Sequence, residues 1–225
     1  GTDTALNNAV VALDSIKLSA AASHRCFVAE VMGRKCGYLS LMSGLATGAE
    51  KVYLNEEGIT LAGLAADSER MVESFRSGRS LYLVIRNERA SVNYTTDVLA
   101  HIFAEEGKGL YDVREAILGH QQQGGSPTAF DRIMATKLVA HSLELLAGAL
   151  KRGEPTASYV GLIRGKVSDH PLDRMNDDLD RDNRRPRHQW WLGLRPAVGL
   201  VSQDIGTLAL QDVPDFGEAV DDAAS

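Results

Sequence analysis

The stretch Glu30-Val31-Met32-Gly33-Arg34-Lys35-Cys36-Gly37-Tyr38 decides how the rest of the chain is interpreted. Residues 26–29 before it form a short apolar run typical of a buried strand, and residues 38–42 after it resemble the start of a helix. The two glycines allow a tight turn and a close approach of a ligand to the backbone. A helix start presents free N–H groups and a positive dipole, and the Arg-Lys pair adds formal charge. The stretch therefore predicts a phosphate-binding turn. The alternative is an ordinary turn whose basic residues face solvent.

Helical and strand patterns alternate on both sides of this turn. Residues 80–85 are the clearest strand, because their continuous apolar run is typical of a parallel strand buried on both faces. The other expected strands are 26–31, 51–54, 116–118 and 159–163, and the expected helices are 4–20, 38–47, 61–77, 96–107 and one from Ser126-Pro127 to Gly153. This alternation predicts a layered α/β domain with a mostly parallel sheet and ligands at the carboxyl ends of its strands.

The composition limits the classes of function. The chain has 225 residues, 44% of them hydrophobic and 24% charged, with a net charge of −6 that argues against broad nucleic-acid binding. No uninterrupted apolar run approaches the ~20 residues that span a bilayer, so no membrane association is expected. Cys26 and Cys36 have the character of reduced thiols, which favours a cytoplasmic protein in which a disulfide is possible but not needed.

Several polar residues follow the expected strands, where α/β proteins place binding groups. Glu88 comes directly after the strand 80–85 and could accept a hydrogen bond from a sugar hydroxyl, or could simply be an exposed strand end. His120, Gln121, Gln122 and Gln123 form a dense group of hydrogen-bonding side chains after the expected strand 116–118. The pair Trp190-Trp191 lies next to arginines. It is either a base-stacking device or, as is more common, an anchor for the tail.

The stretch 31–39 resembles the sugar-phosphate turn of 6-phosphofructokinases. The segments 86–88, 93–97, 105–109 and 118–132 resemble the same family in the same order, and residues 189–196 are similar to the tail of the long eukaryotic ATP-dependent enzymes. The resemblance covers residues 1–196. It implies that the parent enzyme transfers a phosphoryl group to fructose 6-phosphate in glycolysis, with ATP and Mg²⁺ as its cofactors. It also implies that the parent enzyme is a homo- or hetero-oligomer, with a tetramer or larger assembly expected.

The family's eukaryotic members are tandem duplications whose second half has become a unit that binds fructose 2,6-bisphosphate. Gln123 stands where the catalytic pattern has Arg, and this favours the distal part of the second half. Arg34 favours a catalytic half instead, because it fits the catalytic turn of the family. By resemblance, the sugar-bisphosphate contacts would be Arg25, Met32, Gly33, Arg34, Glu88, Arg114, His120, Gln121, Gln122, Gln123 and Arg184. Arg25 is the expected contributor across a subunit or half-to-half interface, so a complete site would need a partner.

No catalytic residue, metal ligand or cofactor is expected in this chain. The family's Thr-Ile-Asp-Asn-Asp segment and nucleotide loops are not in the sequence, and no P-loop replaces them. The chain alone is therefore expected to be inactive and to expose apolar surface that a missing lobe would cover. The alternatives are the substrate-binding part of a catalytic half or of a pyrophosphate-dependent relative.

The resemblance also implies a division of the chain. Residues 1–127 would form the sugar-phosphate-binding lobe, and residues 128–168 a helix and strands that return toward the other lobe. Residues 169–210 would form a polar loop and the double-Trp tail that packs back, and residues 211–225 an acidic disordered tail.

Overall fold

The structure, a computed structural model, describes residues 1–20, 23–153, 155, 157–163 and 165–200. The expected acidic tail, 211–225, lies outside these residues. The described residues divide into two compact units: one holds residues 5–125 and 195–200, and the other holds residues 1–4 and 126–194. We call them the sheet unit and the hairpin unit, and each is described by itself.

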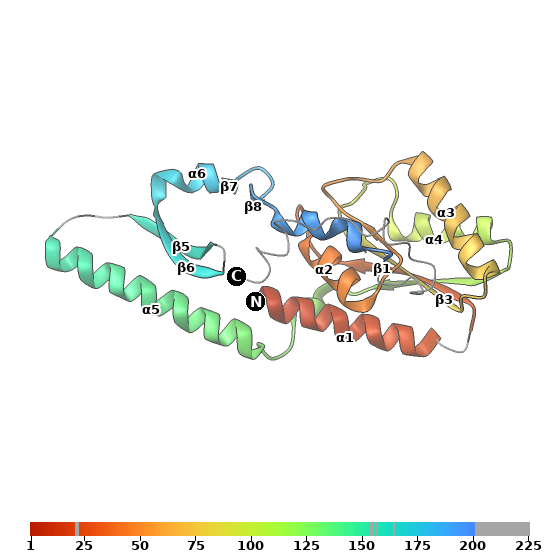
Figure 1. Ribbon diagram of the computed structural model, residues 1–225, viewed down its shortest axis with the longest axis horizontal. Helices are drawn as coiled ribbons and strands as arrows, with labels where there is room; N and C mark the ends of the chain where they lie inside the picture. Colours follow the sequence, from red (N-terminus) through yellow and green to blue (C-terminus); the bar gives the residue numbers. More distant parts are fainter. Residues whose placement is uncertain (21–22, 154, 156, 164, 201–225) are drawn as a thin grey trace. The chain divides into compact units, whose positions relative to one another are not determined.

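The sheet unit confirms the expected parallel α/β architecture (Figure 1). Its four strands lie in the order β2-β3-β1-β4, and every pairing between neighbours is parallel. The strands are β1 (Arg25–Val31), β2 (Lys51–Tyr53), β3 (Leu81–Asn87) and β4 (Asp112–Ile117). The helices are α1 (Thr2–Ala20, of which Ala5 onward belongs to this unit), α2 (Tyr38–Thr47), α3 (Leu61–Arg76) and α4 (Thr96–Gly107), with the 3-10 turn η1 (Gly119–Gln123) after β4.

Helices cover both faces of this sheet. On one face, the side chains of Cys26, Val28 and Val84 join a buried core with Leu64, Met71 and Phe75 of α3 and with Leu99 and Phe103 of α4. The alternation of side chains along a strand places Phe27, Ala29 and Val31 on the opposite face. There α2 packs so closely that a Cβ on Gly44 would lie 2.4 Å from Cγ2 of Val52. Both Cys26 and Cys36 are free cysteines.

The helix ends of the sheet unit follow local sequence signals. Thr60 and Thr95 accept hydrogen bonds from the N–H groups of Gly63 and Val98, as N-caps do. Gly48 ends α2 in the left-handed conformation with a φ of 64°, which costs a glycine little.

The hairpin unit differs more from the expectation. Its long helix α5 (Ala129–Arg152) packs on an antiparallel hairpin of β5 (Ser158–Ile163) and β6 (Lys166–Pro171), where His141 Nε2 lies 2.9 Å from Asp169 Oδ1. The predicted helix start at Ser126-Pro127 is wrong, because Thr128 is the N-cap and accepts a hydrogen bond from the N–H of Asp131. The remaining elements are η2 (Leu172–Arg174), α6 (Met175–Asp178), β7 (Leu179–Asp180), β8 (Arg185–Pro186) and η3 (Trp190–Ala197), whose last residues belong to the sheet unit.

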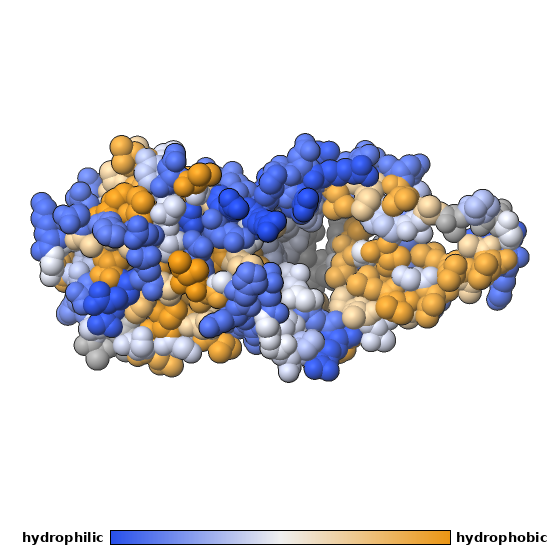
Figure 2. Space-filling view, turned by 180° about the vertical axis from the view of Figure 1, so that it is seen from behind, coloured by the Kyte–Doolittle hydropathy of each residue, from blue (hydrophilic) through white to orange (hydrophobic). Residues whose placement is uncertain are grey.

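An apolar stripe runs along α5 on a side that the hairpin does not cover. Val139, Leu143, Leu146 and Leu150 follow one another at spacings of four, three and four, and their exposed fractions lie between 55% and 74%. Figure 2 shows the apolar surface that these residues and their neighbours make over the helix. By length and composition α5 is also apolar enough to cross a membrane. It carries Lys137, Glu144 and Lys151 at spacings of seven on another side, which leaves it amphipathic.

The segment after the tryptophan pair is fixed to the sheet unit. Arg195 donates from Nη2 to the carbonyl oxygen of Val52 at 3.0 Å, and its Nε lies 2.9 Å from Glu57 Oε1. The side chain of Trp191 is 4% exposed, so it has no free face for a nucleic-acid base to stack on. These contacts favour the anchor over the base-stacking device.

Candidate sugar-phosphate site

The turn between β1 and α2 has a shape that requires glycine at Gly33. Gly33 has a φ of 150°, and a Cβ there would lie 2.4 Å from the carbonyl oxygen of Cys36 and 2.8 Å from Nδ2 of Asn87. The N–H of Cys36 donates to the carbonyl oxygen of Gly33 at 3.3 Å and closes the turn. The predicted strand, glycine turn and helix start are therefore all present at this point of the chain.

Side chains of the protein itself take the backbone donors of this turn. The N–H of Met32 donates to Gln122 Oε1 at 3.0 Å, and the N–H of Gly33 donates to Glu88 Oε1 at 3.2 Å. The N–H of Gly37, at the start of α2, donates to both carboxylate oxygens of Glu56 at 2.9 and 3.0 Å. Two of these three acceptors are carboxylates, which indicates that the turn favours negative charge. An anionic ligand that used the same donors would have to replace them.

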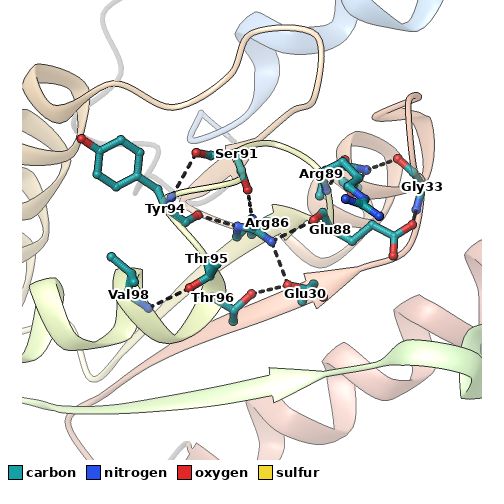
Figure 3. A network of polar contacts seen from close by, with 12 residues as sticks. Glu30, Gly33, Arg86, Glu88, Arg89, Ser91, Tyr94, Thr95, Thr96 and Val98 are labelled. Carbon is teal, nitrogen blue, oxygen red and sulfur yellow. Dashed lines mark hydrogen bonds and ion pairs between the residues drawn. The ribbon is translucent and has the colours of Figure 1, made fainter. Parts of the chain in front are cut away.

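The loop after β3, which carries Glu88, is held by a buried ion pair (Figure 3). Arg86 is 2% exposed, and its Nη1 lies 2.7 Å from Oε2 of Glu30 on the neighbouring strand. The same guanidinium donates to the carbonyl oxygens of Tyr94 at 3.0 Å and Ser91 at 2.6 Å, and the hydroxyl of Thr96 donates to Glu30. Burial lowers the pKa of Arg86 from its ordinary value, and the Glu30 carboxylate opposes that shift. The pair fixes the loop that starts at Glu88.

The glutamine-rich segment after β4 reaches the same edge of the sheet. Gln122 is 2% exposed, while His120, Gln121 and Gln123 are exposed. Asn8 of α1 holds the segment by donating to the carbonyl oxygen of Gly124 at 2.6 Å and to that of Gln122 at 3.3 Å. A shallow cavity of about 250 Å³ lies between α1 and the segment, lined by Asn8, Val11, Ala12, Leu118, Gln121, Gln122 and Gly125. Of the four predicted contacts, Gln122 thus meets the turn directly.

Arg34 is the cation nearest the turn in the sequence, and it is exposed. Within the part of the chain that the structure describes, it has no ion pair or hydrogen bond. A ligand anion at the turn would therefore find this guanidinium without a competing partner.

Arg25 and Arg114 lie toward the other end of the same strands. Arg25 opens β1, and Arg114 pairs in register with Phe27, so their Cα atoms lie roughly 20 and 13 Å along the sheet from Val31 at ~3.3 Å per residue. Both guanidinium groups face Asp112, at 3.9 and 3.5 Å. Strand register therefore separates Arg114 from the turn within this one sheet, and its contact with a ligand stays a prediction. Arg184 is exposed in the hairpin unit, with a φ of 52° in the turn between β7 and β8.

Two side chains at the turn were not predicted as contacts. Asn87 is fully buried beside Gly33, and Glu56 lies in the loop after β2. Asn87 stands within the polar run that follows residues 80–85, which is a usable signal. No sequence pattern indicated Glu56, because its contact with the turn depends on long-range packing.

Among the described residues, no three His, Cys, Asp or Glu side chains come together to hold a metal ion.

Comparisons with known proteins find relatives of this chain. The family model described as phosphofructokinase matches residues 1–146. The chain is 46% identical to an ATP-dependent 6-phosphofructokinase of Dictyostelium discoideum over 214 residues, which are 94% of this chain and 25% of that protein. It is 39% identical to the human muscle-type enzyme, with 90% of this chain and 27% of that protein covered. The structure of phosphofructokinase from Saccharomyces cerevisiae superposes with a TM-score of 0.83 at 34% identity and covers 90% of this chain and 28% of that chain. The chain thus spans about a quarter of the relatives it matches.

Proposed function

The chain belongs to the phosphofructokinase family, and on that premise we propose that it is a segment of an ATP-dependent 6-phosphofructokinase polypeptide. The parent enzyme would transfer phosphate from ATP to fructose 6-phosphate in the glycolysis of the cytoplasm. This segment would be the distal part of the C-terminal half. Its own role would be to bind fructose 2,6-bisphosphate as an allosteric activator.

The observation that carries the proposal is the occupied turn. Gln122 and Glu88, both predicted contacts, accept hydrogen bonds from the N–H groups of Met32 and Gly33, and the next residue, Arg34, is exposed with no ion pair or hydrogen bond among the described residues. A sugar bisphosphate can offer phosphate oxygens to these donors and hydroxyls to Glu88. Arginine is suited to the phosphates, because its fork makes charge-assisted, paired hydrogen bonds.

The effector role rests on the sequence at the same edge. Gln123 stands where the catalytic pattern of the family has an arginine, and a glutamine amide adds hydrogen bonds without positive charge. The catalytic acid segment and the nucleotide loops are not in this sequence, so the phosphoryl-transfer machinery would have to come from elsewhere in the parent polypeptide.

A second copy or the other half of the parent protein would complete the site. Arg25 and Arg114 lie at the opposite end of the strands from the turn, so they cannot reach the same ligand from one sheet. They are well placed to serve the turn of a partner instead. The apolar stripe of α5 would be covered by the rest of the parent polypeptide. The match covers 25% and 27% of the Dictyostelium and human relatives, so about three quarters of each lies beyond it.

Titration calorimetry and a coupled kinase assay test the proposal on the same preparations of the parent protein. We expect saturable binding of fructose 2,6-bisphosphate at this turn without turnover there. Arg34→Ala should weaken binding at its own turn, and Arg114→Ala should weaken binding at the turn of a partner. Each loss should be about 1.5–3 kcal/mol, the scale of a charged hydrogen bond. Unchanged affinity in both variants would remove the site. A loss of fructose 6-phosphate turnover with no change in activation would favour the catalytic half, and dependence of that turnover on pyrophosphate would favour the pyrophosphate-dependent relative.

A further inference from the structure

Asn87, the last residue of β3, binds the turn from inside the protein. The side chain is fully buried, and its Nδ2 donates to the carbonyl oxygen of Gly33 at 2.8 Å. The same nitrogen lies 3.4 Å from the carbonyl oxygen of Cys36 and 3.4 Å from the hydroxyl of Ser40 at the start of α2. One amide group therefore contacts the beginning of the turn, its end and the helix that follows.

The other end of the same amide holds the loop that carries Glu88. Asn87 Oδ1 accepts a hydrogen bond from the N–H of Arg89 at 3.1 Å. The N–H of Glu88, between these two residues, donates to the carbonyl oxygen of Val31 at 3.0 Å. The backbone on either side of Glu88 is thus tied to β1 and to Asn87.

These contacts determine where the donors of the turn point. The carbonyl oxygen of Gly33 faces Asn87 in the interior, and the N–H of the same residue donates to Glu88 at 3.2 Å. Without the amide, the carbonyl oxygens of Gly33 and Cys36 would lose a buried donor, which is costly enough to favour rearrangement of the turn. Asn87 therefore sets two things together, the shape of the turn and the position of Glu88.

We infer that Asn87 is a positioning residue for anion binding at this turn, although it touches no ligand itself. The inference rests on the proposed function for the identity of the ligand. It does not rest on it for the geometry, because the contacts of Asn87 exist in the free protein. A preorganised turn loses less freedom on binding, and this appears as affinity.

The test uses Asn87→Ala, which removes both ends of the amide, and Asn87→Asp, which keeps the shape and removes the donor. Asn93→Ala is the matched control, because Asn93 is an exposed asparagine of the same loop region. All variants are made in the parent protein. Affinity for fructose 2,6-bisphosphate is measured by titration calorimetry, and the backbone amide signal of Gly33 is followed by NMR without ligand, with the amide of Gly78 as a reference away from the turn.

We expect both Asn87 variants to bind at least tenfold more weakly and to shift the Gly33 signal while the Gly78 signal stays in place. Asn93→Ala should change neither. Folded Asn87 variants with an unchanged Gly33 signal, or with affinity within twofold of the unsubstituted protein, would overturn the inference. So would a failure of both variants to fold, because Asn87 would then be a residue of the fold. If the unsubstituted protein does not bind the ligand, the proposed function fails, and the Gly33 signal still decides the role of Asn87.

Discussion

The N–H of Gly33 donates to the Glu88 carboxylate across 3.2 Å, which joins the turn after β1 to the loop after β3. The two residues are 55 positions apart in the sequence, and parallel pairing of β1 with β3 brings them to the same edge. The contact places a negative group of the protein at the point where the sequence predicts a bound anion. If the proposed function is right, ligand binding at this turn would be an exchange, in which the incoming oxygen replaces the carboxylate or shares the donor with it.

Gly33→Ala should damage the turn itself. The added Cβ would lie 2.4 Å from the carbonyl oxygen of Cys36, and the φ of 150° is unfavourable for alanine. We expect the free energy of unfolding to fall by about 1–3 kcal/mol, as is usual for strained backbone, and sugar-bisphosphate binding to be lost. Denaturant unfolding and titration calorimetry measure the two effects. Gly124→Ala, at a site with ordinary contact at 3.5 Å, is the control, and equal losses in both variants would contradict this account of the turn.

Arg86→Met should destabilise the sheet unit. The substitution removes the cation paired with the Glu30 carboxylate and the donor to the carbonyl oxygens of Ser91 and Tyr94. Removing one partner of a buried ion pair costs about 3–5 kcal/mol, and we expect a fall in unfolding free energy on that scale. Denaturant unfolding is the measurement. Arg89→Met removes an exposed arginine of the same loop and should cost little. Similar stabilities of the two variants would show that the Glu30–Arg86 pair does not hold the loop.

Asp131 should make the hairpin unit sensitive to acid. Hydrogen bonds from the hydroxyl and N–H of Thr4, at 2.5 and 2.7 Å, lower the pKa of its carboxyl group to about 2. Since the unfolded-state value is about 3.9, this contribution to stability is complete above about pH 4 and is lost as the pH falls through about 2. Thermal unfolding between pH 2 and 7 should show Asp131→Asn to be less stable at neutral pH and to converge with the unsubstituted chain near pH 2. A constant difference across this range would contradict the assignment.

The apolar stripe of α5 should determine how the chain associates. Leu143→Glu with Leu146→Glu places two charges on the stripe, whose members are exposed in this chain. We expect less self-association of the chain in sedimentation velocity, because exposed apolar area is removed. In the parent protein the same pair should lower the melting temperature, because the stripe would be buried there. The control variant, Lys137→Glu with Lys151→Glu, places two glutamates on the polar side of α5. It should change neither the self-association of the chain nor the melting temperature of the parent protein. A parent protein that tolerates the stripe variant unchanged would show that nothing covers α5.

Much of the sheet unit was predictable because its signals are local. Thr60, Thr95 and Gly48 mark helix ends by chemistry that acts within a few residues. The buried strand β3 was equally clear, because a run of apolar residues leaves few alternatives. The turn at Gly33 was indicated by both kinds of signal, an apolar run before it and glycines at the turn itself.

The errors arose where contacts between distant segments decide the outcome. Residues 169–171 were expected to lie in a polar loop, and pairing with β5 makes them the end of strand β6. Thr128 replaces Ser126 as the cap of α5, where Asp3 accepts a hydrogen bond from its hydroxyl at 2.6 Å. The resemblance alone grouped Arg114 with the turn. The register of β4 against β1 places Arg114 opposite Phe27, away from the turn within this sheet.

Mapping amide chemical shifts during a titration with fructose 2,6-bisphosphate tests the central claim most directly. The signals of Met32 and Gly33 and those of the segment 119–123 should move together and give one dissociation constant, which should agree with calorimetry. Shifts that cluster elsewhere in the chain, or none at ligand concentrations that saturate the calorimetric signal, would contradict a sugar-bisphosphate site at this turn.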